Sequence, residues 1–119
     1  MTNFVLNMLS TENAEISASA ALSGGVAFGG LRLFGIVMPA AWTTAPITFQ
    51  VSHDNGVTWH NLYDADGVEV TVQAAPLRYI ALDPVLYSAV SMIKVRSGTA
   101  AAPVNQVAAC DVGLVLRSV

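Results

Sequence analysis

The sequence has 119 residues, of which 54% are hydrophobic and 11% charged, and its formal net charge is −3. This length fits a single domain, and the composition excludes a disordered chain, which needs low hydrophobicity and high charge. The five basic residues are scattered along the chain and form no phosphate-binding stripe, which argues against a nucleic-acid partner.

Membrane insertion and export are also disfavoured. Residues 33–53 form the longest uncharged stretch, but Pro39 and Pro46 interrupt it, so we expect no transmembrane helix. The apolar positions at the start of the chain have no basic residue before them, unlike a secretory signal. Cys110 is the only cysteine, which excludes an internal disulfide. We therefore expect a protein made in a reducing compartment.

Short apolar or alternating segments, separated by Gly, Pro, Asn and Asp, predict an all-β chain. In chain order, the expected strands are residues 15–21, 31–38, 47–52, 57–63, 68–72, 78–82, 92–97 and 112–119. Residues 26–28 are expected to form a loop or a short edge strand. Residues 85–91 are expected to form one helical turn or a loop. Such short strands at roughly ten-residue spacing are typical of a β-sandwich or barrel. We expect a single-domain antiparallel β-sandwich, jelly-roll-like, with about eight strands.

Three details of this prediction concern particular segments. Residues 1–13 lack a strand pattern and are expected to form an N-terminal arm, with the β-sandwich domain in residues 14–119. Residues 68–72 have the cleanest alternation of the chain, with valines on one face. In the strand at 92–97, Lys94 and Arg96 are expected to point outward.

The most specific motif reads S-x-D-x-G-x-T-W and begins at Ser52. Gly56 allows the positive φ that a tight hairpin needs. The Asp54 carboxylate is expected to accept hydrogen bonds from turn N–H groups two or three residues on, and Ser52 or Thr58 to add a bond across the hairpin base. Trp59 is expected to cap the core. The motif resembles the Asp-box, a hairpin motif of sialidases and other β families. This resemblance implies a structural turn, because the Asp-box usually lies away from the catalytic site.

A broader pattern extends from Leu31 to Val119. It includes Trp42 and the segments Phe34–Pro39, Ile47–Ser52, Arg78–Pro84 and Ile93–Gly98. The pattern resembles small β-sandwich virion proteins of tailed phages and prophages, particularly the decoration (cement) proteins of the head. It is also similar to jelly-roll carbohydrate-binding modules.

Several polar groups could carry chemistry, and for each a simpler interpretation is favoured. His53, Asp54 and His60 are close enough in sequence for a zinc site, but Asp54 is expected to be used by the turn. Residues 64–67, Asp-Ala-Asp-Gly, begin like a calcium loop, but Glu69 follows too early for an EF-hand. We expect a plain turn there and no metal.

Catalysis is likewise not expected. Asp64, Asp66 and Glu69 are conceivable glycosidase acids. A chain of this length, however, has few residues to form the walls of a substrate cleft. Cys110 has no visible base or positive neighbour and is expected to be a buried, apolar-like side chain.

We therefore expect a non-enzymatic structural protein without a cofactor. The leading hypothesis, from the resemblance, is a decoration protein that is made in the host bacterial cytoplasm and binds the major capsid protein on the virion head surface. The uncharged loops 19–31 and 98–109 are expected to make contacts. The low charge implies self-association, and the symmetry of capsid lattices favours a homotrimer. The alternative is a carbohydrate-binding module, either standing alone or on a phage tail, with Trp42 as an exposed platform.

Overall fold

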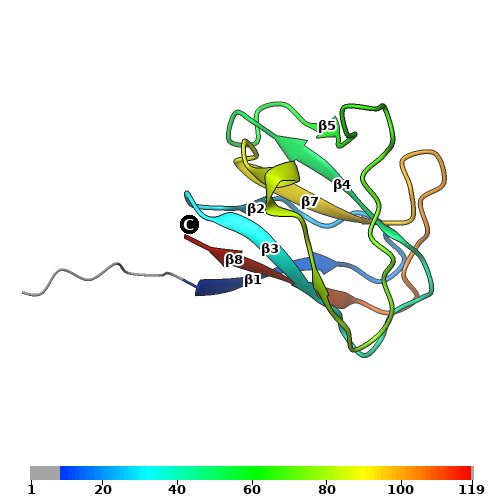
Figure 1. Ribbon diagram of the computed structural model, residues 1–119. Coiled ribbons are helices and arrows are strands. Elements are labelled where there is room, and N and C mark those ends of the chain that lie inside the picture. The colour runs from blue at the N-terminus through cyan, green and yellow to red at the C-terminus, as the bar shows by residue number, and fades with distance from the viewer. Residues whose placement is uncertain (1–8, 119) are drawn as a thin grey trace, which may run out of the picture.

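The computed structural model describes residues 9–118, in which two four-stranded antiparallel sheets pack as a β-sandwich (Figure 1). Sheet A has the strand order β1 (Leu9–Ile16), β8 (Cys110–Arg117), β3 (Arg32–Val37), β6 (Tyr79–Ala81). Sheet B has the order β2 (Val26–Ala27), β7 (Met92–Ser97), β4 (Ile47–Ser52), β5 (His60–Asn61). The 3₁₀ helix η1 (Pro84–Tyr87) follows β6. The predicted all-β, antiparallel sandwich of eight strands is confirmed.

The core lies between the two sheets and is built from the inward positions of alternating strands. Its fully buried side chains include Ile16, Leu33, Ile36, Ile47, Phe49, Ile93, Val95, Val112 and Leu114. Tyr87 of η1 packs edge-on against the Phe49 ring, with the ring centroids 5.5 Å apart. The β-branched and aromatic residues that predict strands therefore also supply the packing.

The N-terminal strand begins earlier than the sequence predicts. β1 covers Leu9–Ile16 and pairs with β8 along its whole length. Residues 9–13, expected in the arm, belong to this strand, while residues 1–8 of the expected arm lie outside the described residues. Both Ser10 and Glu12 are polar at positions on the inward side of β1, so the sequence there shows no alternation.

The expected strand at residues 68–72 does not form, in spite of its alternating valines. Val70 N–H donates to the Leu62 carbonyl (3.0 Å), whereas Val72 exchanges two hydrogen bonds with Ile47 of β4 (2.8 and 2.9 Å). The pairing is divided between a local hairpin and β4, so no continuous ladder develops. Residues 62–72, here called the edge segment, instead form an irregular border beside β4.

The edge segment also changes the environment of Arg96. Its side chain projects from the outer face of sheet B, as predicted, but only 6% of the residue is exposed. The guanidinium donates to Thr48 Oγ1 (3.0 Å), Asn61 Oδ1 (3.1 Å) and Glu69 Oε2 (3.2 Å). Arg96 therefore points outward as predicted, and the edge segment buries it by covering this part of sheet B.

No helix in residues 9–118 is long and apolar enough to cross a membrane.

Candidate functional site

The turn between β4 and β5 is organised around the Asp54 carboxylate. Thr58 donates to it twice, from its N–H (2.9 Å) and from its hydroxyl (2.6 Å), and the Ser52 hydroxyl donates at 2.8 Å. Ser52 Oγ in turn accepts from Gly56 N–H at 2.8 Å. The main-chain donor to Asp54 lies four residues on, and not two or three as expected. These hydrogen bonds connect the two ends of the turn at Ser52 and Thr58 through the Asp54 carboxylate.

The same network sets the charge state of Asp54. The hydrogen bonds from the Thr58 hydroxyl and N–H and from Ser52 favour the ionised carboxylate and hold the pKa of Asp54 well below its usual range. Gly56 has φ +90° and Asn55 φ +58°, so the chain reverses through two left-handed residues. The arrangement stabilises a turn, and the lowered pKa makes the carboxylate a weak proton acceptor near neutral pH.

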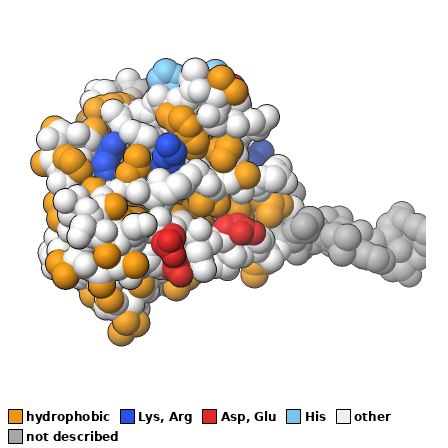
Figure 2. All heavy atoms as spheres, turned by 180° about the vertical axis from the view of Figure 1, so that it is seen from behind, with side chains coloured by type: hydrophobic (Ala, Val, Ile, Leu, Met, Phe, Trp, Pro, Cys, Tyr) orange, Lys and Arg blue, Asp and Glu red, His pale blue; other side chains and the backbone are white. Residues whose placement is uncertain are grey.

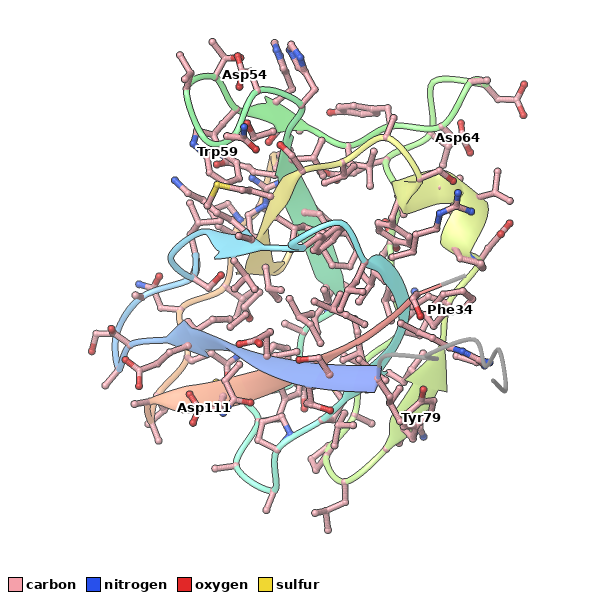
Figure 3. The ribbon with its side chains drawn as sticks, turned by 90° about the vertical axis from the view of Figure 1, so that its left-hand side faces the viewer. Phe34, Asp54, Trp59, Asp64, Tyr79 and Asp111 are labelled. Atoms are coloured by element: carbon pink, nitrogen blue, oxygen red, sulfur yellow. The ribbon has the colours of Figure 1, made fainter. Side chains whose placement is uncertain are left out.

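Trp59 lies at the outer side of sheet B and does not cap the core as expected. Its ring packs against Met92 and Gly25, where an added Cβ would come within 3.1 Å of the ring. The indole Nε1 donates to the Gly56 carbonyl (3.1 Å), and Lys94 Nζ lies 4.5 Å from the ring centroid. In Figure 3, Trp59 and Asp54 lie at the same end of the sandwich. Trp59 is half-buried and forms part of a surface.

Trp42, the expected exposed platform, is buried. Only 8% of the residue is exposed, and its Nε1 donates to the Ala45 carbonyl at 3.2 Å. The loop that carries it is held by Gln106, whose amide accepts from Thr43 N–H (2.7 Å) and donates to the Thr43 carbonyl (3.0 Å). Gln106 is itself 1% exposed. The sequence does not predict these hydrogen bonds of Gln106, because a glutamine in a loop gives no pattern that indicates burial.

The candidate metal ligands are distributed over separate interactions. The His53 and His60 rings stack with their centroids 6.1 Å apart, while Asp54 serves the turn. Asp64 Oδ1 accepts from the N–H groups of Asp66 (2.9 Å) and Val68 (3.0 Å), as a turn-forming aspartate does. Among residues 9–118, no group of three His, Cys, Asp or Glu side chains is arranged to hold a metal ion.

Two further residues considered for chemistry, Glu69 and Cys110, are occupied or buried, whereas Asp66 is exposed. Both carboxylate oxygens of Glu69 accept from Ala100 N–H, and Oε2 pairs with Arg96. Cys110 is 6% exposed, and burial, with a smaller contribution from Asp111, raises the pKa of its thiol. A raised pKa disfavours the reactive thiolate.

The exposed surface carries many large hydrophobic side chains. Figure 2 shows hydrophobic side chains, small ones included, spread over one face with few charged groups between them. Among residues 9–118, the large hydrophobic residues that are at least 40% exposed are Leu9, Val37, Val57, Tyr63, Val68, Leu77, Tyr79, Val85, Leu86 and Val107. Of the two loops expected to make contacts, 98–109 presents Val107 (81% exposed), whereas 19–31 buries Phe28 (2% exposed). The first loop is therefore the better candidate for a contact.

Comparison with known protein families, curated proteins and solved structures found no match for this chain.

Proposed function

We propose that this chain is a non-enzymatic structural protein of a tailed-phage virion, a decoration protein that binds the major capsid protein on the head surface. The observation that carries the proposal is that ten large hydrophobic residues among residues 9–118 remain at least 40% exposed, in a chain with 11% charged residues. Val37 and Tyr79 of this set stand opposite each other on β3 and β6, and adjoining exposed apolar side chains mark interaction sites. The class of partner comes from the resemblance of residues 31–119 to head decoration proteins.

The use of the acidic groups also supports a structural role. Asp54 and Asp64 hold turns through their carboxylates, and Glu69 neutralises a buried arginine. General acid–base catalysis needs a carboxyl group within reach of a substrate proton. These three carboxylates instead stabilise the fold.

The direct test is cryo-electron microscopy of virions purified from the phage that encodes this chain. We expect density for the sandwich at regular positions on the outside of the head, and the chain in the mass spectrum of the particle. Virions of full composition that lack the chain would refute the proposal.

The loop contact is tested by two valines of matched exposure. Val107 in loop 98–109 is 81% exposed and Val57 in the β4–β5 turn is 80% exposed. Val107→Asp should reduce co-sedimentation of the full chain with purified heads at least about tenfold, as for the loss of an apolar contact at an interface centre. Val57→Asp should leave it unchanged. Equal binding of both variants would exclude the loop as the contact.

One observation favours a carbohydrate-binding module as the second candidate. The half-buried indole of Trp59 lies on the outer side of sheet B beside Lys94, and exposed aromatic rings with polar neighbours suit sugar binding. The candidate platform thus moves from Trp42 to Trp59. Binding on a glycan array that is lost in Trp59→Ala but retained in Val57→Ala would favour the module over the virion protein.

A further inference from the structure

The outer face of sheet A carries two pairs of like charges, one at each end. Glu15 of β1 stands directly opposite Asp111 of β8, and Arg32 of β3 stands directly opposite Arg117 of β8. All four residues are exposed and alternate with inward-facing neighbours that are buried. Like charges at opposed positions repel. In the part of the chain that the structure describes, none of the four takes part in an ion pair.

The two pairs lie far apart along the same strand. Asp111 and Arg117 are separated by six positions of β8, which is about 20 Å in an extended strand. The outer-face positions between them carry no charge: Thr11, Asn13, Gly35, Val37, Tyr79, Ala81, Gly113 and Val115. Glu12, the other charged residue within the strands of this sheet, alternates with these positions and belongs to the opposite side. The face is therefore acidic at one end, basic at the other and neutral between.

Most of the neutral part of this face is apolar, and it allows a close approach. Val37 and Tyr79 stand opposite each other on β3 and β6 and are 42% and 60% exposed. Gly113 lies at the middle of β8 without a side chain, and the Tyr79 ring covers Gly35, where a Cβ would collide with it. In Figure 3, Tyr79 and Asp111 lie towards opposite ends of the same sheet. Small residues at the centre let another sheet pack at ordinary sheet-to-sheet distance.

We propose that the outer face of sheet A binds the same face of a second copy of this chain through a two-fold axis. The axis lies between the two faces and perpendicular to the strands, so it reverses the strand direction of the second copy. The acidic pair of each copy then meets the basic pair of the other, and Arg117 of one copy faces Asp111 of its partner. Each pair of like charges then lies beside opposite charges of the partner copy. The partner also covers the exposed side chains of Val37 and Tyr79.

This contact differs from the trimer expected from capsid symmetry. A two-fold axis makes the same surface self-complementary, whereas a cyclic trimer joins two different surfaces. The exposed apolar side chains on this face are few, Val37 and Tyr79 among them, so we expect the dimer to belong to the weak complexes. The inference does not depend on the virion role, because it rests only on the charges and burial of sheet A.

Charge reversal of each end provides the test, with the full chain studied by sedimentation velocity up to about 0.5 mM, where a complex of the weak class is populated. Glu15→Lys with Asp111→Lys makes both ends basic, and Arg32→Glu with Arg117→Glu makes both ends acidic. We expect each double variant to weaken self-association at least about tenfold. An equimolar mixture of the two should form a 1:1 dimer that is at least as stable as the wild-type dimer.

Asp66→Lys is the matched control, because it also reverses an exposed acid but lies in the turn at residues 64–67, on the edge segment beside sheet B. It should leave self-association unchanged. Circular dichroism confirms that each variant is folded, and the mixture is informative even where one variant is less stable. A wild-type chain that stays monomeric, a trimer as the only oligomer, or a mixture that fails to pair would each overturn the proposal.

Discussion

Arg96 of β7 and Glu69 of the edge segment form an ion pair with a nitrogen–oxygen distance of 3.2 Å, and their side chains are only 8% and 16% exposed. Glu69→Gln removes the negative charge and leaves the guanidinium buried without a counter-charge. We expect the free energy of unfolding to fall by about 3 kcal/mol, as for other buried pairs that lose one partner. Urea denaturation measures this change. As the control, Asp66→Asn in the nearby turn should change the free energy of unfolding by less than about 0.5 kcal/mol. An equal effect of both variants would show that the Arg96–Glu69 ion pair does not stabilise the fold.

Asp54→Ala should lower the midpoint temperature of unfolding. The substitution leaves Thr58 N–H without its side-chain acceptor and removes the partner of two hydroxyl groups. Differential scanning fluorimetry gives the midpoint, with Asp66→Ala as the control because the Asp66 side chain lies in another turn. An unchanged midpoint would mean that Asp54 does not anchor the β4–β5 turn.

The stabilising effect of Asp54 should depend on pH. Its pKa is lower in the folded chain than the ordinary aspartate value of about 4. A lowered folded pKa means that the stabilisation is complete above the unfolded pKa and is lost as the pH falls towards the folded pKa. The difference in stability between wild type and Asp54→Asn should therefore be constant from about pH 5 to 7 and shrink below about pH 4. A difference that grows on acidification would contradict this assignment.

Leu77 precedes β6 with φ +60° and is 78% exposed. The left-handed conformation costs a leucine roughly 1–2 kcal/mol, and asparagine tolerates it better. Leu77→Asn should therefore raise the free energy of unfolding by about 0.5–1 kcal/mol. Leu86→Asn, at a 40% exposed site on η1, should bring no such gain. A loss of stability in Leu77→Asn would show that the leucine makes contacts that outweigh its backbone strain.

Cys110 should react slowly with a thiol reagent such as 5,5′-dithiobis(2-nitrobenzoic acid). Burial restricts access, and the raised pKa reduces the fraction of thiolate. Since Cys110 is the only cysteine, absorbance reports this residue alone. Unfolding in guanidinium should accelerate the reaction at least about tenfold. Asp111→Asn should accelerate it less, because burial is the larger cause of the shift. Rapid reaction of the folded chain would contradict the buried position.

The parts of the fold that the sequence predicts best are those with one buried face. The strands Ile47–Ser52 and Met92–Ser97 are predicted residue for residue, because their inward side chains are apolar and turns flank them. The predicted start of β1 lies too far along the chain, because Ser10 and Glu12 interrupt the apolar pattern of its inward positions. The valines of residues 68–72 were misleading, because half-buried loops can alternate as strands do.

The candidate site shows the same limit for single residues. The residues of the β4–β5 turn are local in sequence, and their hydrogen bonds follow from short-range geometry, so Asp54 could be assigned to the turn. The environments of Trp42 and Trp59 depend on Gln106 and Lys94, which lie far along the chain. No local pattern predicts such contacts. The sequence therefore predicts an exposed Trp42 and a buried Trp59, whereas Trp42 is buried and Trp59 lies at the surface.

The position of β8 has a consequence for the order of events in folding. β8 is the last strand in the chain, yet both β1 and β3 pair with it, and Leu9 stands opposite Arg117 about a hundred residues later. Contacts between such distant residues slow folding, because a large loop must close before they form. During synthesis, β1 and β3 cannot pair with β8 until β8 has left the ribosome. Until then the side chains of Ile16 and Leu33 are exposed, and a chaperone can bind them. Loss of this one strand would leave sheet A without either of its two longest pairings.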